Sequence, residues 1–178
     1  MRAARTPKAL GLTFNTLESR LLRHILKQII TNYQITPQDL NPKAASVWYS
    51  AKGCESARMS PEETQEWLEH LHQYKSAHVQ NLTKWRRRLA LPKEGHCRLN
   101  VKLEEVPVLL SALNDHRLFL AASHDLGQKE MDARSVADFA NLQPAQQMAV
   151  SEIHVLGCII EEILRFLPGN PADWMESL

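Results

Sequence analysis

The sequence lacks the features that stabilise secreted proteins and that anchor proteins in membranes. Its three cysteines, Cys54, Cys97 and Cys158, are odd in number and far apart, and no C-x-x-C pair occurs. They form no recognisable disulfide framework, so a reduced, cytoplasmic setting is the simplest interpretation. No apolar run approaches the roughly 18 residues that a transmembrane helix needs. The basic N-terminus lacks the apolar segment of a secretory signal.

Motifs for cofactors and catalysis are also scarce. The six glycines form no phosphate-binding loop, which argues against a nucleotide-binding fold. Among eight histidines there is no His-Glu-x-x-His, and only Glu69 and His72 have the Glu-x-x-His spacing of which a di-iron bundle needs two copies. No catalytic residue, metal site or cofactor is therefore predicted. The sequence favours a non-enzymatic protein and leaves an enzyme as an alternative.

The overall composition is that of an ordinary soluble protein. A net charge of +1 with 23% charged residues gives no argument for binding to a membrane or to nucleic acid. The length, 178 residues, is sufficient for one domain with a substantial core. We predict a flexible tail over residues 1–13 and a single helical domain over residues 14–178.

Hydrophobic periodicity and helix-capping residues predict four long helices, at 16–33, 61–91, 104–126 and 144–167. Asn15 with Glu18, and Ser60 with Glu63, have the spacing of capping boxes. Shorter helices are expected near 44–51 and 135–141, and an extended lead-in at 97–103. The predicted fold is an all-α, single-domain bundle of about four main helices plus short helices.

The stretch from Glu104 to Leu126 is apolar on two opposite faces, as in a helix that runs through the middle of a bundle. Pro107 suits its first turn, and Gly127 suits a left-handed residue after its end. Arg117 lies near the centre of the main apolar arc. An unpaired buried guanidinium is very costly, so this residue must reach solvent or meet a carboxylate.

Glu18 and Glu152 likewise fall on the apolar faces of their helices. We therefore expect Arg117 to lie between these two carboxylates, as a buried structural tie rather than a catalytic site. For Glu18 the alternative is that it caps its own helix. Asn114 and Asp115 point elsewhere on the helix, toward a neighbouring backbone or solvent. Together these five residues are the candidate binding site.

Two surface features remain. A narrow apolar stripe with Trp67 and Trp85 five turns apart suits packing on the bundle or pairing with another subunit, and His78 within it is expected to be a packed core histidine. The basic run Lys84, Arg86, Arg87 and Arg88 wraps around its helix instead of lining one face. This arrangement favours a solvated helix end over nucleic-acid binding.

Two segments resemble an uncharacterised bacterial family catalogued as a domain of unknown function, number two thousand and seventeen. The first carries Phe14, Glu18, Leu21 and Leu22; the second, with the pattern A-L-N-D-x-R-L, runs from Ala112 to Leu118. The resemblance implies a small, cytoplasmic, mostly helical protein without established activity. Members are often encoded beside the Clp protease adaptor, so the resemblance implies a link to protein turnover.

The predicted function is a non-enzymatic interaction or regulatory protein that binds a protein partner or a second copy of itself. One alternative is an enzyme or small-molecule binder with a charged pocket around Arg117. The other is nucleic-acid binding through the run from Lys84 to Arg88, which we consider the weaker one. No membrane interaction is expected.

Overall fold

The computed structural model describes residues 1–50, 52–89, 95–131 and 139–167. Helices dominate these ranges, but they also contain a three-stranded antiparallel sheet in the order β1-β2-β3. Its strands are β1 (Arg2–Arg5), β2 (Ala9–Asn15) and β3 (His96–Lys102). The all-α prediction is therefore wrong, and the fold is mixed α/β with helices in the majority. Strands β1 and β2 occupy most of the segment that was expected to be a tail.

The central strand of the sheet, β2, pairs with a strand that is distant in the sequence, β3. Ala9 of β2 lies opposite Lys102 of β3, and Asn15 lies opposite His96. In β3 buried and exposed residues alternate, whereas three consecutive residues of β2, from Leu10 to Leu12, are buried. The extended segment expected at 97–103 is thus an edge strand of a sheet.

The helices begin largely where the capping signals predict. Both capping boxes are present, at Asn15 with Glu18 and at Ser60 with Glu63. The helices are α1 (Thr16–Gln34), α2 (Pro42–Trp48), α3 (Lys52–Ser56), α4 (Pro61–Ala77), α5 (Val79–Arg88), α6 (Val106–Ser123), α7 (Gln128–Met131) and α9 (Pro144–Leu164), with a 3-10 turn at Leu103–Glu105.

Three local expectations need correction or cannot be compared. The long helix expected at 61–91 is divided at His78 into α4 and α5. Just before this break, Ser76 Oγ donates a hydrogen bond to α1 and the Lys75 ammonium donates one to α6. The left-handed residue after α6 is Asp125, with φ 53°, and not Gly127. The short helix expected at 135–141 lies mostly outside the described residues.

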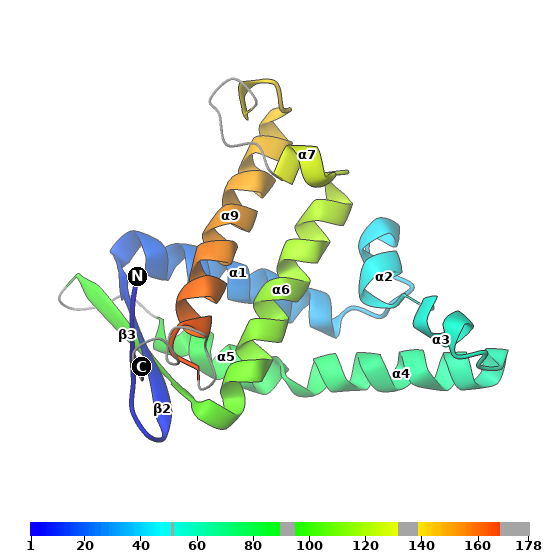
Figure 1. The fold of residues 1–178 in the computed structure, drawn as a ribbon, viewed down its shortest axis with the longest axis horizontal. Coiled ribbons are helices and arrows are strands. Elements are labelled where there is room, and N and C mark those ends of the chain that lie inside the picture. Colours follow the sequence, from blue (N-terminus) through cyan, green and yellow to red (C-terminus); the bar gives the residue numbers. More distant parts are fainter. Residues whose placement is uncertain (51, 90–94, 132–138, 168–178) are drawn as a thin grey trace, which may run out of the picture.

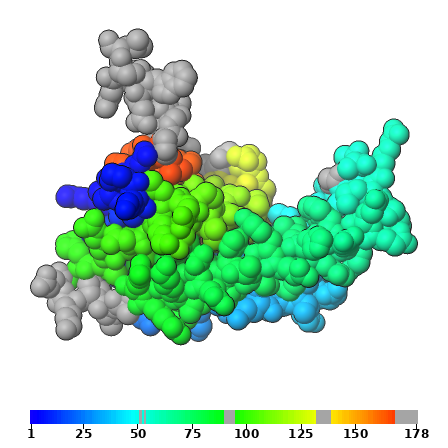
Figure 2. Space-filling view, turned by 90° about the horizontal axis from the view of Figure 1, so that it is seen from below, coloured from blue at the N-terminus to red at the C-terminus, as the bar shows by residue number. Residues whose placement is uncertain are grey.

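Helices α6 and α9 run side by side and cross α1, while the sheet lies at the end of the molecule near the N-terminus (Figure 1). One apolar core joins the sheet to these helices through Leu12, Ile25, Leu113 and Ile163. Helix α4 extends away from this core, and the α3–α4 end projects from the body (Figure 2). In α4 the one buried residue is Lys75.

Candidate functional site

Glu18 caps its own helix. Its carboxylate accepts a hydrogen bond from the backbone N–H of Asn15 at 2.8 Å, and Asn15 Oδ1 accepts one from the N–H of Glu18 at 2.9 Å. The other carboxylate oxygen pairs with the amine of Met1. Burial raises the pKa of Glu18, but the Met1 amine and the Asn15 N–H outweigh it, so the net shift is downward. The predicted ion pair with Arg117 does not form.

Glu152 meets a different residue of α6. Its Oε1 accepts a hydrogen bond from Nε2 of His116 at 2.8 Å, and the His116 side chain is completely buried. Arg117 is only half-buried and makes no ion pair with any described residue; its Nε has no hydrogen-bond partner there. The expected tie between Arg117 and two carboxylates is therefore wrong, because α6 turns His116, not Arg117, into the core.

Asp115 is the centre of the buried charged network. Its carboxylate pairs with the ammonium of Lys75 and accepts a hydrogen bond from Tyr33 Oη at 2.6 Å, while its backbone carbonyl accepts one from Trp48 Nε1 at 2.7 Å. The network thus ties α1, α2 and α4 to α6. Asn114, the neighbouring candidate, is exposed.

The Lys75 ammonium also lies 5.5 Å from the centre of the Tyr33 ring and 5.2 Å from that of Trp48. Burial and the Asp115 carboxylate raise the pKa of Tyr33 far above its usual value, so its hydroxyl remains a hydrogen-bond donor. The Lys75 ammonium and the Asp115 carboxylate neutralise each other, and the two aromatic rings lie beside the ammonium. Such an arrangement is typical of an ion pair with a structural role. Lys75 could have been found from the sequence, because its helical position lies between those of Leu68 and Leu71 on the apolar stripe of α4.

A small pocket of about 270 Å³ lies beside this network, where Tyr49 Oη and His72 Nδ1 are 3.3 Å apart. Burial and the negative charge of Asp115 raise the pKa of Tyr49 to about 12. A phenol with this pKa stays protonated at neutral pH, so Tyr49 can donate a hydrogen bond there but cannot act as a general base. Among the described residues no group of three metal-ligating side chains comes together.

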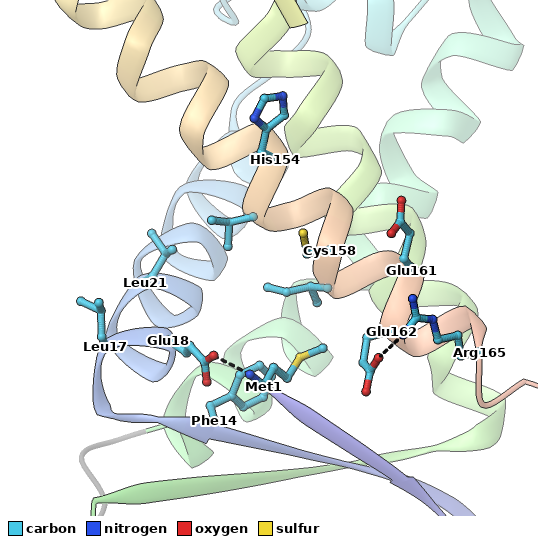
Figure 3. Close-up of a pocket in the computed structure, with 12 residues that line it drawn as sticks. Met1, Phe14, Leu17, Glu18, Leu21, His154, Cys158, Glu161, Glu162 and Arg165 are labelled. Atoms are coloured by element: carbon cyan, nitrogen blue, oxygen red, sulfur yellow. Dashed lines mark hydrogen bonds and ion pairs between the residues drawn. The ribbon is translucent and has the colours of Figure 1, made fainter. Parts of the chain in front are cut away.

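The larger cavity is an open groove of about 580 Å³ between α1 and α9. Leu17 and Leu21 of α1 lie across from His154 and Cys158 of α9, and Phe14 of the sheet lies at the base (Figure 3). Most of the lining is apolar, yet Leu17 is 76% exposed and Val155 is 36% exposed. The groove is therefore an apolar surface that is open to solvent.

Acidic side chains border the groove. Glu161 and Glu162 of α9 line it together with Glu18. Arg165 pairs with Glu162 at 3.4 Å, and His154 Nε2 is 2.7 Å from the carbonyl of Met131. The sequence does not reveal this groove, because Leu17 lies on the same apolar arc of α1 as the buried Leu22, Ile25, Leu26 and Ile29.

The tryptophan stripe divides between core and surface. Trp85 is fully buried, whereas Trp67 is 39% exposed and Tyr74 is 54% exposed. In the basic run, Lys84 Nζ is 3.5 Å from Glu105 and Arg88 donates to the carbonyl of Asn100 at 3.3 Å. In the described part of the chain no helix is long and apolar enough to cross a membrane.

Comparison with known proteins gives a family and no relative of known activity. Searches of the curated proteins and of the solved structures found no match. The sequence profile of a family described as "Domain of unknown function (DUF2017)" matches residues 70–167, which include α5, α6 and α9 and the second of the two resembling segments. The first segment, around Glu18, precedes the match. Because the match covers more than half of the 178 residues, the chain belongs to the DUF2017 family.

Proposed function

We propose that this protein is a protein-binding module and that the groove between α1 and α9 is its binding site. The observation that carries the proposal is the exposure of Leu17, 76%, at the edge of an apolar groove of about 580 Å³. Burying one leucine side chain contributes roughly 1.5–3 kcal/mol, so a partner that covers Leu17 gains substantial binding energy.

The lining of the groove favours an amphipathic helix with a basic flank as the partner. Two helices and a strand form the walls, and a third helix laid between helices uses the same packing that holds a bundle together. Its apolar side chains would contact Leu17, Leu21 and Val155. A lysine or arginine beside them would face Glu161, which is exposed on α9.

Selection from a phage-displayed library of helical peptides tests this proposal. Selected peptides are expected to carry apolar residues at i, i+3 or i+4 and i+7, with Lys or Arg on the adjacent face. Binding of a labelled selected peptide is then measured by fluorescence anisotropy. Leu17→Asp is expected to weaken it by about tenfold or more, since a central apolar anchor is replaced by a charge.

Met148→Asp is the matched control. Met148 is 75% exposed, nearly the same as Leu17, and lies near the start of α9 without lining the groove. We expect its substitution to leave the affinity within about twofold. Equal loss in the two variants, or no loss in Leu17→Asp, would overturn the proposal.

A second copy of this chain is the alternative occupant, and sedimentation velocity distinguishes it. Self-association that depends on concentration and disappears in Leu17→Asp would replace the heterologous helix with a homo-oligomer. The link to protein turnover implied by the family resemblance has no support in the geometry of the groove. A small-molecule or enzymatic role around Arg117 is disfavoured, because neither cavity described above is lined by Arg117.

A further inference from the structure

The outer face of the sheet, which we call the outer sheet face, is basic, and its residues Arg2, Ala4, Arg98 and Asn100 are exposed among the described residues. None of the 4, 7 and 7 residues in the three strands is acidic. Strand register places Arg2, Thr13 and Arg98 in one row across the sheet, and Ala4, Gly11 and Asn100 in the next. Neighbouring strands are about 4.8 Å apart, so the two arginines lie on either side of a central strand with small side chains.

Arg98 lies flat on this face. A Cβ added to Gly11 would be 3.0 Å from Nη2 and 3.1 Å from Nε of Arg98. Because both nitrogens are close to this Cβ position, the guanidinium group covers Gly11 instead of extending into solvent. Arg98 is nonetheless exposed, and one face of its planar group is available to a ligand. Arg2 and Arg98 make no ion pair with a described residue.

Other positive charges lie around the same strands. Lys102, two rows from Arg98, is paired with Glu104 at 3.1 Å, and this carboxylate raises the pKa of Lys102. Arg88 of α5 donates to the carbonyl of Asn100 on β3 at 3.3 Å and thereby brings the basic run to the sheet. The turn between β1 and β2 adds the exposed side chain of Lys8. Arg5 does not belong to this face, because it lies opposite the buried Leu10 and donates to the carbonyl of Phe166 at 3.4 Å.

We propose that the outer sheet face binds single-stranded nucleic acid. The arginines on either side of the central strand supply contacts to phosphates, and the exposed plane of Arg98 supplies a surface on which a base can stack. The helical wrapping of the run from Lys84 to Arg88 argued against such binding on that helix alone. The sheet places Arg2 and Arg98 beside this basic run, on one flat surface.

A single strand fits this face better than a duplex or a membrane does. Reading a duplex requires an element that enters a groove, and the small central residues Ala9 and Gly11 make this face flat. Insertion into a bilayer requires exposed apolar side chains, and no strand residue is among the large exposed hydrophobic ones.

The test is fluorescence anisotropy of the full chain with a labelled oligouridine of about 12 nucleotides, at about 50 mM and about 200 mM salt. We expect saturable binding that weakens steeply as salt increases. Arg98→Gln is expected to reduce affinity by about threefold to tenfold and to lower the slope of log K against log salt by about 0.7, the loss of one phosphate contact. Arg2→Gln, at the other end of the same row, is expected to act similarly.

Two further variants separate position from charge. Arg23→Gln removes one exposed positive charge on α1, outside the sheet, and is expected to leave the affinity within about twofold. Gly11→Ala changes no charge but displaces the flexible end of Arg98, and about a threefold loss is expected as stacking is lost. Circular dichroism confirms that each variant is folded.

Several results would overturn the proposal. These are no saturable binding at low salt, equal losses in Arg98→Gln and Arg23→Gln, and tighter binding of a duplex of the same length. Binding to vesicles that contain phosphatidylserine, without binding to the oligonucleotide, would assign the face to a membrane instead. None of these outcomes affects the groove between α1 and α9, because its residues are not changed.

Discussion

The ammonium of Lys75 pairs with the carboxylate of Asp115 in the interior of the protein, where the two side chains are 8% and 14% exposed. This contact joins α4, in which no other residue is buried, to the central helix α6. Tyr33 and Trp48 complete the network from α1 and α2. The ion pair thus holds the projecting helix together with the hydrogen bond from Ser76 to α1 and the packing of Leu68 and Leu71 on the core.

Lys75→Met is expected to lower the free energy of unfolding by about 3–5 kcal/mol, because it leaves the Asp115 carboxylate buried without its counter-charge. Adding Asp115→Leu and Tyr33→Phe removes the other polar partners and is expected to restore much of that loss. Urea denaturation followed by circular dichroism measures both variants. A triple variant less stable than Lys75→Met would show that the network contributes more than the compensation of its own charges.

The pair of His116 and Glu152 predicts a difference between two substitutions at one position. Glu152→Gln keeps an acceptor for the buried Nε2–H of His116, whereas Glu152→Leu leaves that donor unsatisfied. We expect Glu152→Leu to be the less stable variant by about 1–3 kcal/mol. Thermal unfolding by calorimetry compares them, and equal stabilities would mean that the hydrogen bond does not tie α9 to α6.

His78, at the junction of α4 and α5, makes stability depend on pH. Burial and the nearby Lys75 ammonium lower the pKa of His78 below 6.5 in the folded chain. The unfolded chain therefore binds more protons near that pH, so the contribution of His78 to stability falls as pH decreases from about 7.5 to about 5.5. His78→Gln should show a shallower decrease than the wild type in urea denaturation over this range. Identical slopes would contradict the assignment.

The helix starts could be predicted because their causes are local. Asn15 and Glu18 bond to each other's backbone within one turn, and proline at position 61 fits the first turn wherever the helix packs. Strand β2 carries a short alternation of large apolar residues, Leu10, Leu12 and Phe14, with small or polar ones. This signal spans only seven residues, and one of the two strands with which β2 pairs, β3, lies more than 80 residues away, so the sheet could not be predicted from local sequence.

The charged site was only partly predictable for a related reason. The apolar arc of α6 correctly identified a buried helix, but a small rotation of its contact face buries His116 and leaves Arg117 at the edge. Asp115 was a candidate, and its partner Lys75 was missed since lysine is usually solvated. Pairing between helices depends on their packing, which the sequence of one helix does not specify.

The most direct test of the proposed groove uses its exposed cysteine. Cys158 lines the groove and is exposed, whereas Cys54 and Cys97 are buried. N-ethylmaleimide should therefore modify Cys158 first, as located by mass spectrometry of peptides. A helical peptide selected from the phage library is predicted to slow this modification in proportion to the fraction bound. A saturating peptide that leaves the rate at Cys158 unchanged would contradict binding in the groove between α1 and α9.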